Sequence, residues 1–305
     1  MALDPQAAAA VAQWTQDAPN VDLTDAQIAE RRAAARAEAL TEPREEVAEV
    51  RDVDAGGVVC RLYRPTTGGS GAVLYAHGGG FVFGDRHTHD AQARRVANRL
   101  GRAVLAVDYR RPPEAAFPAA HDDVTSAGRW LAAHARELGL DPEDVVVLGD
   151  SAGASLALVA ALRDPGLYAA AVLVYPFIDP RLRGASFDAE GAQGFSRAEA
   201  DWFWRTYAGS DARHRELLTN PDFCPLDAPD LGTLPPTQVL VAEHDILHDE
   251  AVLLAQRIAA TGAEVATVTY PGMIHGFWRH PAMFDAAETS YADTAAFLSD
   301  LYPQV

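Results

Sequence analysis

The sequence predicts an α/β fold with a mostly parallel central sheet, helices on both faces of that sheet and a helical cap. Six short runs of apolar, β-branched residues alternate with helical stretches along the 305 residues. The runs are apolar almost throughout, which is typical of strands that are covered by helices on both sides. One long interval, 177–235, contains no such run. This break in the alternation indicates an insertion above the ends of the strands.

The first 45 residues are alanine-rich and charged. Thr24 is a plausible cap for the helix formers that follow it, and the arginines and glutamates of this stretch suit an exposed face. We interpret residues 1–45 as a helical arm that forms part of the cap. The start of the chain has an acidic residue, Asp4, and neither a basic region nor a long apolar run, so we expect no signal peptide and no membrane span. A cytoplasmic protein is the resulting expectation.

The catalytic core is expected in two parts, residues 46–176 and residues 236–305. The expected strands are 72–80, 103–110, 144–151, 170–176, 237–245 and 264–272. The expected helices are about 88–100, 119–138, 152–163, 247–261 and 282–300. Between the two parts, the insertion 177–235 holds the aromatic stretch "FSRAEADWFWRTYAG", and we interpret this insertion as the remainder of the cap.

The charge composition excludes several classes of function. All 25 basic side chains are arginine, so Schiff-base chemistry, a P-loop and a kinase-type phosphate lysine are absent. The formal net charge of -18 disfavours binding to nucleic acid and stable attachment to a membrane. Neutral or cationic small molecules fit better. Cys60 and Cys224 can form at most one disulfide and match no metal or redox motif.

Ser151 stands in the stretch "LGDSAGAS", between glycines two positions away on either side. The expected strand 144–151 ends here and a helix begins near Ala152. Side chains at 149 and 153 would collide in so tight a turn, which explains Gly149 and Gly153. Although a turn serine is the alternative, the strand-to-helix position favours a nucleophile.

A serine hydroxyl needs a general base, an orienting carboxylate and donors for the oxyanion that forms on the substrate. The stretch "HGGG", residues 77–80, follows a strand, and its glycines let peptide N–H groups point into the site. Gly79 and Gly80 are the better candidate donors, and the Ala152 N–H is the third. A flexible glycine turn is the alternative interpretation.

The order serine, acid, histidine restricts the base and the acid to the loops after the last two expected strands. His275 follows the final strand between two glycines and can reach back across the strand ends, and Asp245 ends the preceding strand. His280 is a weaker base because we expect Pro281 to start the last helix. Asp249 and Glu243 are rival acids, and Asp245 is preferred as the first polar residue past the strand end.

Four further histidines have simpler interpretations. His244 and His248 lie beside Asp245 and suit a solvated or helix-capping role. The cluster "DRHTHD", residues 85–90, has the residue types of a metal site but no second set of ligands, so a structural or solvated role is favoured. No residue that we single out requires a metal or a cofactor.

Taken together, these motifs show that the chain resembles the hormone-sensitive lipase family of α/β-hydrolases, in particular its bacterial esterases. The resemblance extends from residue 70 to the C-terminus and rests on "HGGGFVFGD", "DYRRPPEAAFPAAHDD", "GDSAGASLA", "YPFID", "AEHDILHDEA" and "HGF", which occur in the family's order and spacing. Two stretches depart from the pattern. "YRRPPE" replaces the usual Y-R-L-A-P-E, and Ala154 stands where a second glycine is frequent. The first departure lies near Glu114, which in the family tends to support the active-site loops.

The resemblance implies an α/β-hydrolase fold and a carboxylic-ester hydrolase that uses Ser151, Asp245 and His275, with Gly79, Gly80 and Ala152 as the oxyanion hole. We expect uncharged esters with short to medium acyl chains as substrates and a homodimer as an open alternative to a monomer. Candidate pocket residues are Phe81, Trp202 and Phe203, with Trp14, Phe195 and Trp204 as further aromatics, although aromatics at helical spacing are more often core.

Two alternative functions stay open from the sequence. One is an amide hydrolase, such as an arylformamidase or a peptidase, because the same triad can serve a poorer leaving group. The other is a non-catalytic binder of small molecules on the same fold, since a fold alone does not fix a function. Plant hormone receptors that resemble this family lack the catalytic histidine, whereas His275 is present here.

Overall fold

The central sheet has eight strands in the order β1-β2-β4-β3-β5-β6-β7-β8. The computed structural model describes residues 2–14, 19–189 and 194–301. The strands are β1 Glu49–Asp54, β2 Val59–Arg64, β3 Ala72–Ala76, β4 Ala103–Val107, β5 Val145–Asp150, β6 Ala170–Val174, β7 Thr237–His244 and β8 Val265–Ile274. β1 and β2 pair antiparallel, as do β2 and β4, and all the other pairs are parallel. The sheet is therefore mostly parallel, as predicted.

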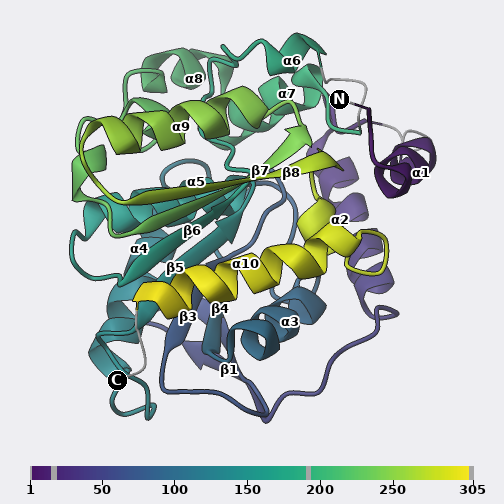
Figure 1. Ribbon diagram of the computed structural model, residues 1–305. Coiled ribbons are helices and arrows are strands. Elements are labelled where there is room, and N and C mark those ends of the chain that lie inside the picture. The colour runs from purple at the N-terminus through teal and green to yellow at the C-terminus, as the bar shows by residue number, and fades with distance from the viewer. Residues whose placement is uncertain (1, 15–18, 190–193, 302–305) are drawn as a thin grey trace.

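Five helices cover the two faces of this sheet (Figure 1). They are α3 Asp90–Leu100, α4 Ala119–His134, α5 Ala152–Arg163, α9 His248–Ala260 and α10 Asp285–Leu301. α4, α5 and α9 share a buried apolar cluster with alternate strand residues such as Leu74. α3 and α10 share a second cluster with the intervening residues, such as Val73 and Tyr75. Strand residues are apolar on both sides because each side faces a helix.

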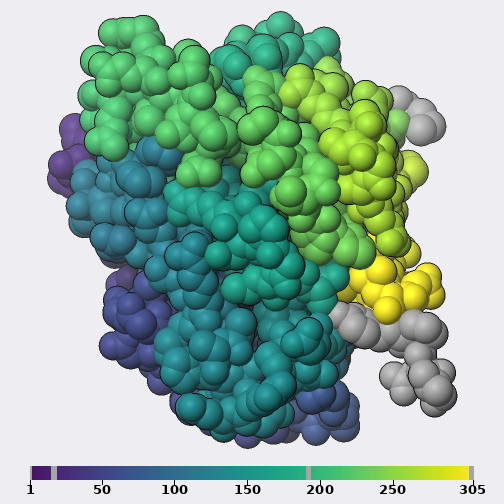
Figure 2. Space-filling view, turned by 90° about the vertical axis from the view of Figure 1, so that its left-hand side faces the viewer, coloured from purple at the N-terminus to yellow at the C-terminus, as the bar shows by residue number. Residues whose placement is uncertain are grey.

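The remaining helices lie toward one end of the sheet. Two belong to the N-terminal arm, α1 Pro5–Trp14 and α2 Asp25–Ala39, and three to the insertion, α6 Ser186–Ala189, α7 Arg197–Ala208 and α8 Asp211–Leu217. α6 to α8 lie above the strands in Figure 1. In Figure 2 the green segment that includes α8 covers part of the top of the molecule. Residues 15–18 of the arm and 190–193 of the insertion lie outside the described residues. The interpretation of both parts as one cap stays a prediction.

The predicted elements agree with the observed ones within a few residues, with two differences. The antiparallel strands β1 and β2 were not among the expected runs. β1 reads EVRDVD and lies largely exposed at the edge of the sheet, so it contains no apolar run. The last helix begins at Asp285, so Pro281 does not start it. Thr24 caps α2 as predicted, in a capping box with Gln27. None of the described helices is long and apolar enough to span a bilayer.

The topology brings distant parts of the sequence to one edge of the sheet. Ser151 follows β5, Asp245 follows β7 and His275 follows β8. Because β5, β6, β7 and β8 run parallel, the carboxyl ends of these strands meet at the same edge. The chain thus places the three predicted side chains within reach of one another.

Candidate active site

Ser151 occupies a strained turn between β5 and α5. Its backbone has φ 54° and ψ -120°, outside the regions that a residue with a side chain ordinarily adopts. A Cβ on Gly149 would lie 2.2 Å from the carbonyl oxygen of Gly153. A Cβ on Gly153 would lie 2.0 Å from the carbonyl oxygen of Ala76 on β3. Both glycines are therefore required by contact with backbone, which is the reason given for them from the sequence.

The hydroxyl of Ser151 is the first member of a continuous chain of hydrogen bonds. His275 Nε2 lies 3.0 Å from Ser151 Oγ, and His275 Nδ1 lies 2.7 Å from Asp245 Oδ2. The other carboxylate oxygen, Asp245 Oδ1, accepts the backbone N–H of Leu247 at 2.9 Å. Asp245 is 1% exposed, so its carboxylate is held between these two partners away from water. With Nδ1–H donating to Asp245, Nε2 is free to accept a proton from the serine.

The rival residues lie elsewhere and make other contacts. Asp249 accepts the backbone N–H of Ser186 at 3.0 Å and lies 3.1 Å from its neighbour His248. Glu243 accepts the backbone N–H of Gly272 at 2.7 Å. Leu247 precedes the first residue of α9 and makes no side-chain cap. The first-turn N–H of Asp249 donates to Ser186 Oγ at 3.3 Å, so the capping role considered for the histidines near Asp245 is not observed. The ring of His280 packs against Trp14, with centroids 5.4 Å apart.

The HGGG loop lies beside the serine with its backbone in glycine-type conformations. Gly79 has φ 114° and Gly80 has φ 60°. The carbonyl of Gly79 accepts the N–H groups of Val82 and Phe83 at 3.1 and 2.8 Å, which fixes the peptide planes of the loop. No hydrogen bond among the described residues uses the N–H of Gly79 or Gly80 as a donor. The N–H of Ala152, as the first residue of α5, has no partner within its own helix.

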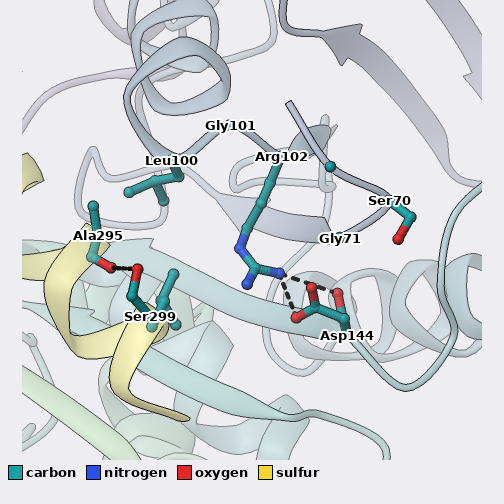
Figure 3. A pocket seen from close by; sticks show the side chains of 10 residues that line it. Ser70, Gly71, Leu100, Gly101, Arg102, Asp144, Ala295 and Ser299 are labelled. Carbon is teal, nitrogen blue, oxygen red and sulfur yellow. Dashed lines mark hydrogen bonds and ion pairs between the residues drawn. The ribbon is translucent and has the colours of Figure 1, made fainter. Parts of the chain in front are cut away.

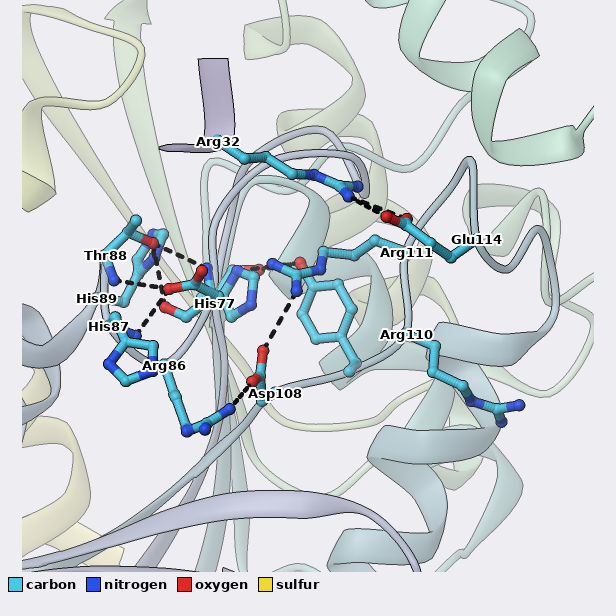
Figure 4. Close-up of polar contacts among 12 residues, drawn as sticks. Arg32, His77, Arg86, His87, Thr88, His89, Asp108, Arg110, Arg111 and Glu114 are labelled. Carbon is cyan, nitrogen blue, oxygen red and sulfur yellow. Dashed lines mark hydrogen bonds and ion pairs between the residues drawn. The ribbon is translucent and has the colours of Figure 1, made fainter. Parts of the chain in front are cut away.

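Buried aromatic rings support this loop from behind. The ring of His77 stacks on Tyr109 and on His89, with centroids 4.3 and 4.7 Å away. His77 and His89 are labelled side by side in Figure 4. The Tyr109 hydroxyl donates to the His77 carbonyl at 2.7 Å, and His77 Nδ1 lies 2.8 Å from the Gly78 carbonyl oxygen. Burial lowers the pKa of His77 to about 4, and the nearby charge of Arg111 acts in the same direction. His77 is thus a neutral support at physiological pH.

An arginine of the N-terminal arm joins α2 to the same loop. Arg32 Nε and Nη2 donate to the Val82 carbonyl at 3.0 and 2.7 Å, and Nη2 also donates to the Pro112 carbonyl. Arg32 Nη1 forms a two-oxygen contact with Glu114 at 2.8 and 2.9 Å (Figure 4). Glu114 therefore reaches the loop through Arg32. Arg32 could not be identified from the sequence, because α2 contains several arginines and nothing in the pattern distinguishes this one.

The hollow that contains Ser151 and His275 has a volume of about 240 Å³. Its aromatic lining comes from Trp14, Tyr175, Phe195 and Phe203, and Gly79 and Gly80 form part of its wall. The prediction for Phe203 agrees with this lining. Phe81 and Trp202 do not line the hollow, which corrects the prediction for both. Phe81 is fully buried and stacks on Tyr207 at 4.1 Å, while Trp202 is 5% exposed and packs on Phe83.

Four polar residues line the hollow that were not expected from the sequence: Asn20, Asp150, Glu199 and Arg279. Asp150 directly precedes Ser151, and Arg279 lies four residues after His275, so nearness to the motifs is the one signal that could have found them. Asn20 and Glu199 come from the two separate parts of the predicted cap. The Glu199 carboxylate accepts the backbone N–H of Asn20 at 2.9 Å, which joins those parts beside the hollow.

A larger hollow of about 480 Å³ lies at the opposite end of the sheet, near the start of β3 and β4. Its polar lining includes the ion pair of Arg102 with Asp144, together with Ser70 and Ser299 (Figure 3). None of its lining residues is a histidine, and its one carboxylate, Asp144, is paired with Arg102. In the described ranges no group of three or more histidine, cysteine, aspartate or glutamate side chains is arranged to hold a metal ion. Both cysteines are free and buried.

Comparison with known proteins adds independent information. A family model described as alpha/beta hydrolase fold matches residues 73–279. An ethyl acetate hydrolase of Pseudomonas putida is 35% identical over 238 residues, 75% of this chain and 74% of that protein. An acetyl-hydrolase of Streptomyces hygroscopicus is 37% identical over 242 residues, 76% of each chain.

Solved structures of esterases also resemble the whole chain. A thermophilic carboxylesterase cloned from a metagenomic library has a TM-score of 0.83 at 36% identity, over 90% of this chain and 98% of the other. A hyperthermophilic esterase from the archaeon Pyrobaculum calidifontis has a TM-score of 0.86 at 33% identity, over 99% of each chain. The similarity thus extends over both the core and the helices above it.

Proposed function

Because the chain belongs to the α/β-hydrolase family and is a serine hydrolase of the carboxylesterase type, we propose that it cleaves uncharged esters of short to medium acyl chains with Ser151, His275 and Asp245. The observation that carries the proposal is the pair of contacts from His275, at 3.0 Å to the serine hydroxyl and at 2.7 Å to the carboxylate. These contacts give each group the partner that acyl transfer requires. The names of two relatives, ethyl acetate hydrolase and acetyl-hydrolase, support a small acyl group.

In the first half of the reaction, His275 Nε2 takes the proton of Ser151 as Oγ attacks the ester carbonyl carbon. The N–H groups of Gly79, Gly80 and Ala152 donate to the oxyanion that results. Asp245 stabilises the imidazolium and remains ionised. His275 then gives the proton to the alkoxy oxygen as the carbon–oxygen bond breaks, and the alcohol leaves an acyl-enzyme behind.

In the second half, water replaces the alcohol. His275 removes a proton from the water as its oxygen attacks the acyl carbon, and the same N–H groups stabilise the second oxyanion. When the bond to Ser151 Oγ breaks, His275 returns the proton to the serine. The carboxylic acid product releases its remaining proton to solvent and leaves as a carboxylate, and the enzyme is restored with no cofactor consumed.

The size and lining of the catalytic hollow support the proposed substrate class. Its volume of about 240 Å³ is small, and Trp14, Phe195 and Phe203 present apolar surface to the acyl or alcohol part of the ester. A Cβ on Gly80 would lie 2.3 Å from the ring of Phe203, so this ring approaches the proposed oxyanion donors closely. The ring therefore limits the length of the acyl chain that can lie beside the donors.

The test is a series of chromogenic esters of two to twelve acyl carbons, assayed with the wild type and with Ser151→Ala. We expect the highest kcat/KM at the short end of the series and a fall of kcat by at least about 10⁴-fold in the variant, which should fold normally. A fluorophosphonate should label the wild type and not the variant. Retention of most of the ester hydrolysis by Ser151→Ala would remove this serine from the role of nucleophile. A matched amide that is cleaved as fast as the ester would favour an amide hydrolase instead.

A further inference from the structure

A second hollow lies on the other side of the HGGG loop from Ser151. It has a volume of about 230 Å³, and its walls include the end of α2, Gly79 of the HGGG loop, and His89. Gly79 and Arg279 line both this hollow and the catalytic one. These two residues are therefore the partition between the hollows, and one of them is a proposed oxyanion donor.

Arg279 carries an unpaired charge. Among the described residues its guanidinium makes no hydrogen bond and no ion pair, and its Nε is buried without a partner. The other charged groups of the catalytic hollow have donors. Glu199 accepts the N–H of Asn20 at 2.9 Å, and Asp150 accepts the Tyr75 hydroxyl at 2.8 Å. A guanidinium that is partly buried without an acceptor is costly, which indicates that an acceptor binds there during the reaction cycle.

The second hollow holds another unpartnered polar group. His89 is 2% exposed, and its Nε2 has no hydrogen-bond partner, while its Nδ1 lies 3.0 Å from the Thr88 hydroxyl. Burial and the charge of Arg279 keep the pKa of His89 well below its usual value, so the ring is neutral. A neutral imidazole can donate one hydrogen bond without adding charge. The hollow thus offers a cation and a neutral polar ring on the path that leads away from Gly79.

From this arrangement we propose that Arg279 binds a carboxylate at the partition between the two hollows, and that this carboxylate is the acid product on its way out of the site. The inference rests on the proposed ester hydrolysis, which releases a carboxylate beside Gly79 in a protein whose formal net charge is -18. Arginine is suited to this role because its planar guanidinium donates to both oxygens of a carboxylate. Glu38 and Glu42 line the second hollow on the side of α2, so a departing anion meets like charge there and does not accumulate.

A simpler role for Arg279 is to balance the buried carboxylate of Asp150. No ion pair joins the two side chains. Burial raises the pKa of Asp150, and the charge of Arg279 opposes that rise. The two roles predict different results: loss of a charge balance would lower kcat on every ester, whereas loss of a product site would change inhibition by the acid.

The experiment compares the wild type, Arg279→Met and Arg279→Lys. Butyrate serves as product inhibitor of the hydrolysis of a neutral butyrate ester. We expect butyrate to inhibit the wild type competitively. The inhibition constant should rise about 10- to 100-fold in Arg279→Met and less in Arg279→Lys. The KM of both variants for the neutral ester should stay within about threefold of the wild-type value. The matched control is Arg129→Met, which should behave as the wild type. It removes the same charge from an ion pair with Asp164 that lies outside both hollows.

Two further arms complete the test. A carboxylate can also be part of the substrate, so kcat/KM is measured for monoethyl succinate and for ethyl valerate. A selective loss on the succinate half-ester in Arg279→Met assigns the bound carboxylate to the substrate and overturns the product assignment. Saturation-transfer NMR of butyrate with Ser151→Ala measures binding without turnover, so it remains informative even if the wild type hydrolyses no ester. Equal butyrate binding and equal inhibition in Arg279→Met and the wild type would overturn the proposal.

Discussion

Replacement of Asp245 by asparagine tests the triad more sharply than its removal does. Asp245 accepts two hydrogen bonds, from His275 Nδ1 at 2.7 Å and from the Leu247 N–H at 2.9 Å. Asparagine has one acceptor oxygen and one NH₂ group. If the oxygen faces Leu247, the NH₂ group faces Nδ1, which then has to be unprotonated. The proton moves to Nε2, and His275 can no longer accept the proton of Ser151.

The cost of this change follows from the two contacts. Turning the amide so that its oxygen faces His275 leaves the Leu247 N–H without an acceptor, which costs about 1–3 kcal/mol. The neutral amide also replaces a charged acceptor that stabilises the imidazolium, worth about 1.5–3 kcal/mol. Together these amount to about 2.5–6 kcal/mol, and at about 1.4 kcal/mol per tenfold change in rate we expect kcat to fall by about 10² to 10⁴-fold.

The assay is steady-state hydrolysis of a short chromogenic ester near pH 8, with thermal unfolding to check the fold. Asp249→Asn is the matched control, because Asp249 was the rival acid, its side chain is 40% exposed and it contacts His248 instead of His275. We expect the control to keep kcat within about threefold of the wild type. A loss below fivefold in Asp245→Asn, or an equal loss in Asp249→Asn, would refute the assignment of Asp245.

Three further predictions concern the supports of the site. Gly153→Ala places a Cβ 2.0 Å from the carbonyl oxygen of Ala76. We therefore expect a loss of ester hydrolysis of at least about 10²-fold or a lowered Tm. A variant that is fully active and as stable as the wild type would contradict this contact. Arg32→Met removes both hydrogen bonds to the Val82 carbonyl. Because this loop carries the proposed oxyanion donors, we expect kcat to fall about 5- to 50-fold and KM to change less. An effect on KM alone would contradict this role. His77, whose pKa burial lowers to about 4, stays neutral in the folded protein while the unfolded chain takes up a proton below about pH 6.5. The free energy of unfolding, measured by urea titration, should therefore fall as the pH drops from about 6.5 to about 5. The contribution of His77 to this fall is at most about 1.4 kcal/mol per pH unit. A rise in the free energy of unfolding over this range would contradict the prediction.

Sequence patterns predicted the parts of the fold that depend on burial. β3 to β7 are buried almost throughout because helices cover both faces, and this makes them visible as continuous runs. β8 is an edge strand with several exposed residues, and its run of valines and Tyr270 made it recognisable. β1 gives no such run, since its residues at the sheet edge are mostly exposed and need only alternate. Its place in the fold depends on antiparallel pairing with β2, which is a property of the tertiary structure.

The candidate site divides in the same way. Ser151 and its flanking glycines were predictable because the steric requirement of one turn determines which residues can occupy the five consecutive positions 149–153. His275 and Asp245 followed from chain order and strand ends. The aromatic lining did not, because "WFW" on α7 presents residues to different sides: Phe203 reaches the hollow, while Trp204 is fully buried. Which side of a helix faces a site depends on packing that spacing alone does not fix.

The helices above the sheet contribute to chemistry as well as to shape. Arg32 of α2 holds the carbonyl of Val82, and the Val82 N–H donates to the carbonyl of Gly79, whose own N–H is a proposed oxyanion donor. Glu114, in the stretch that departs from the family pattern, holds the other end of Arg32. The departure leaves this glutamate in place and therefore preserves the connection. Because two hydrogen bonds connect the arm to Gly79, displacement of α2 should disturb transition-state stabilisation before it disturbs substrate binding.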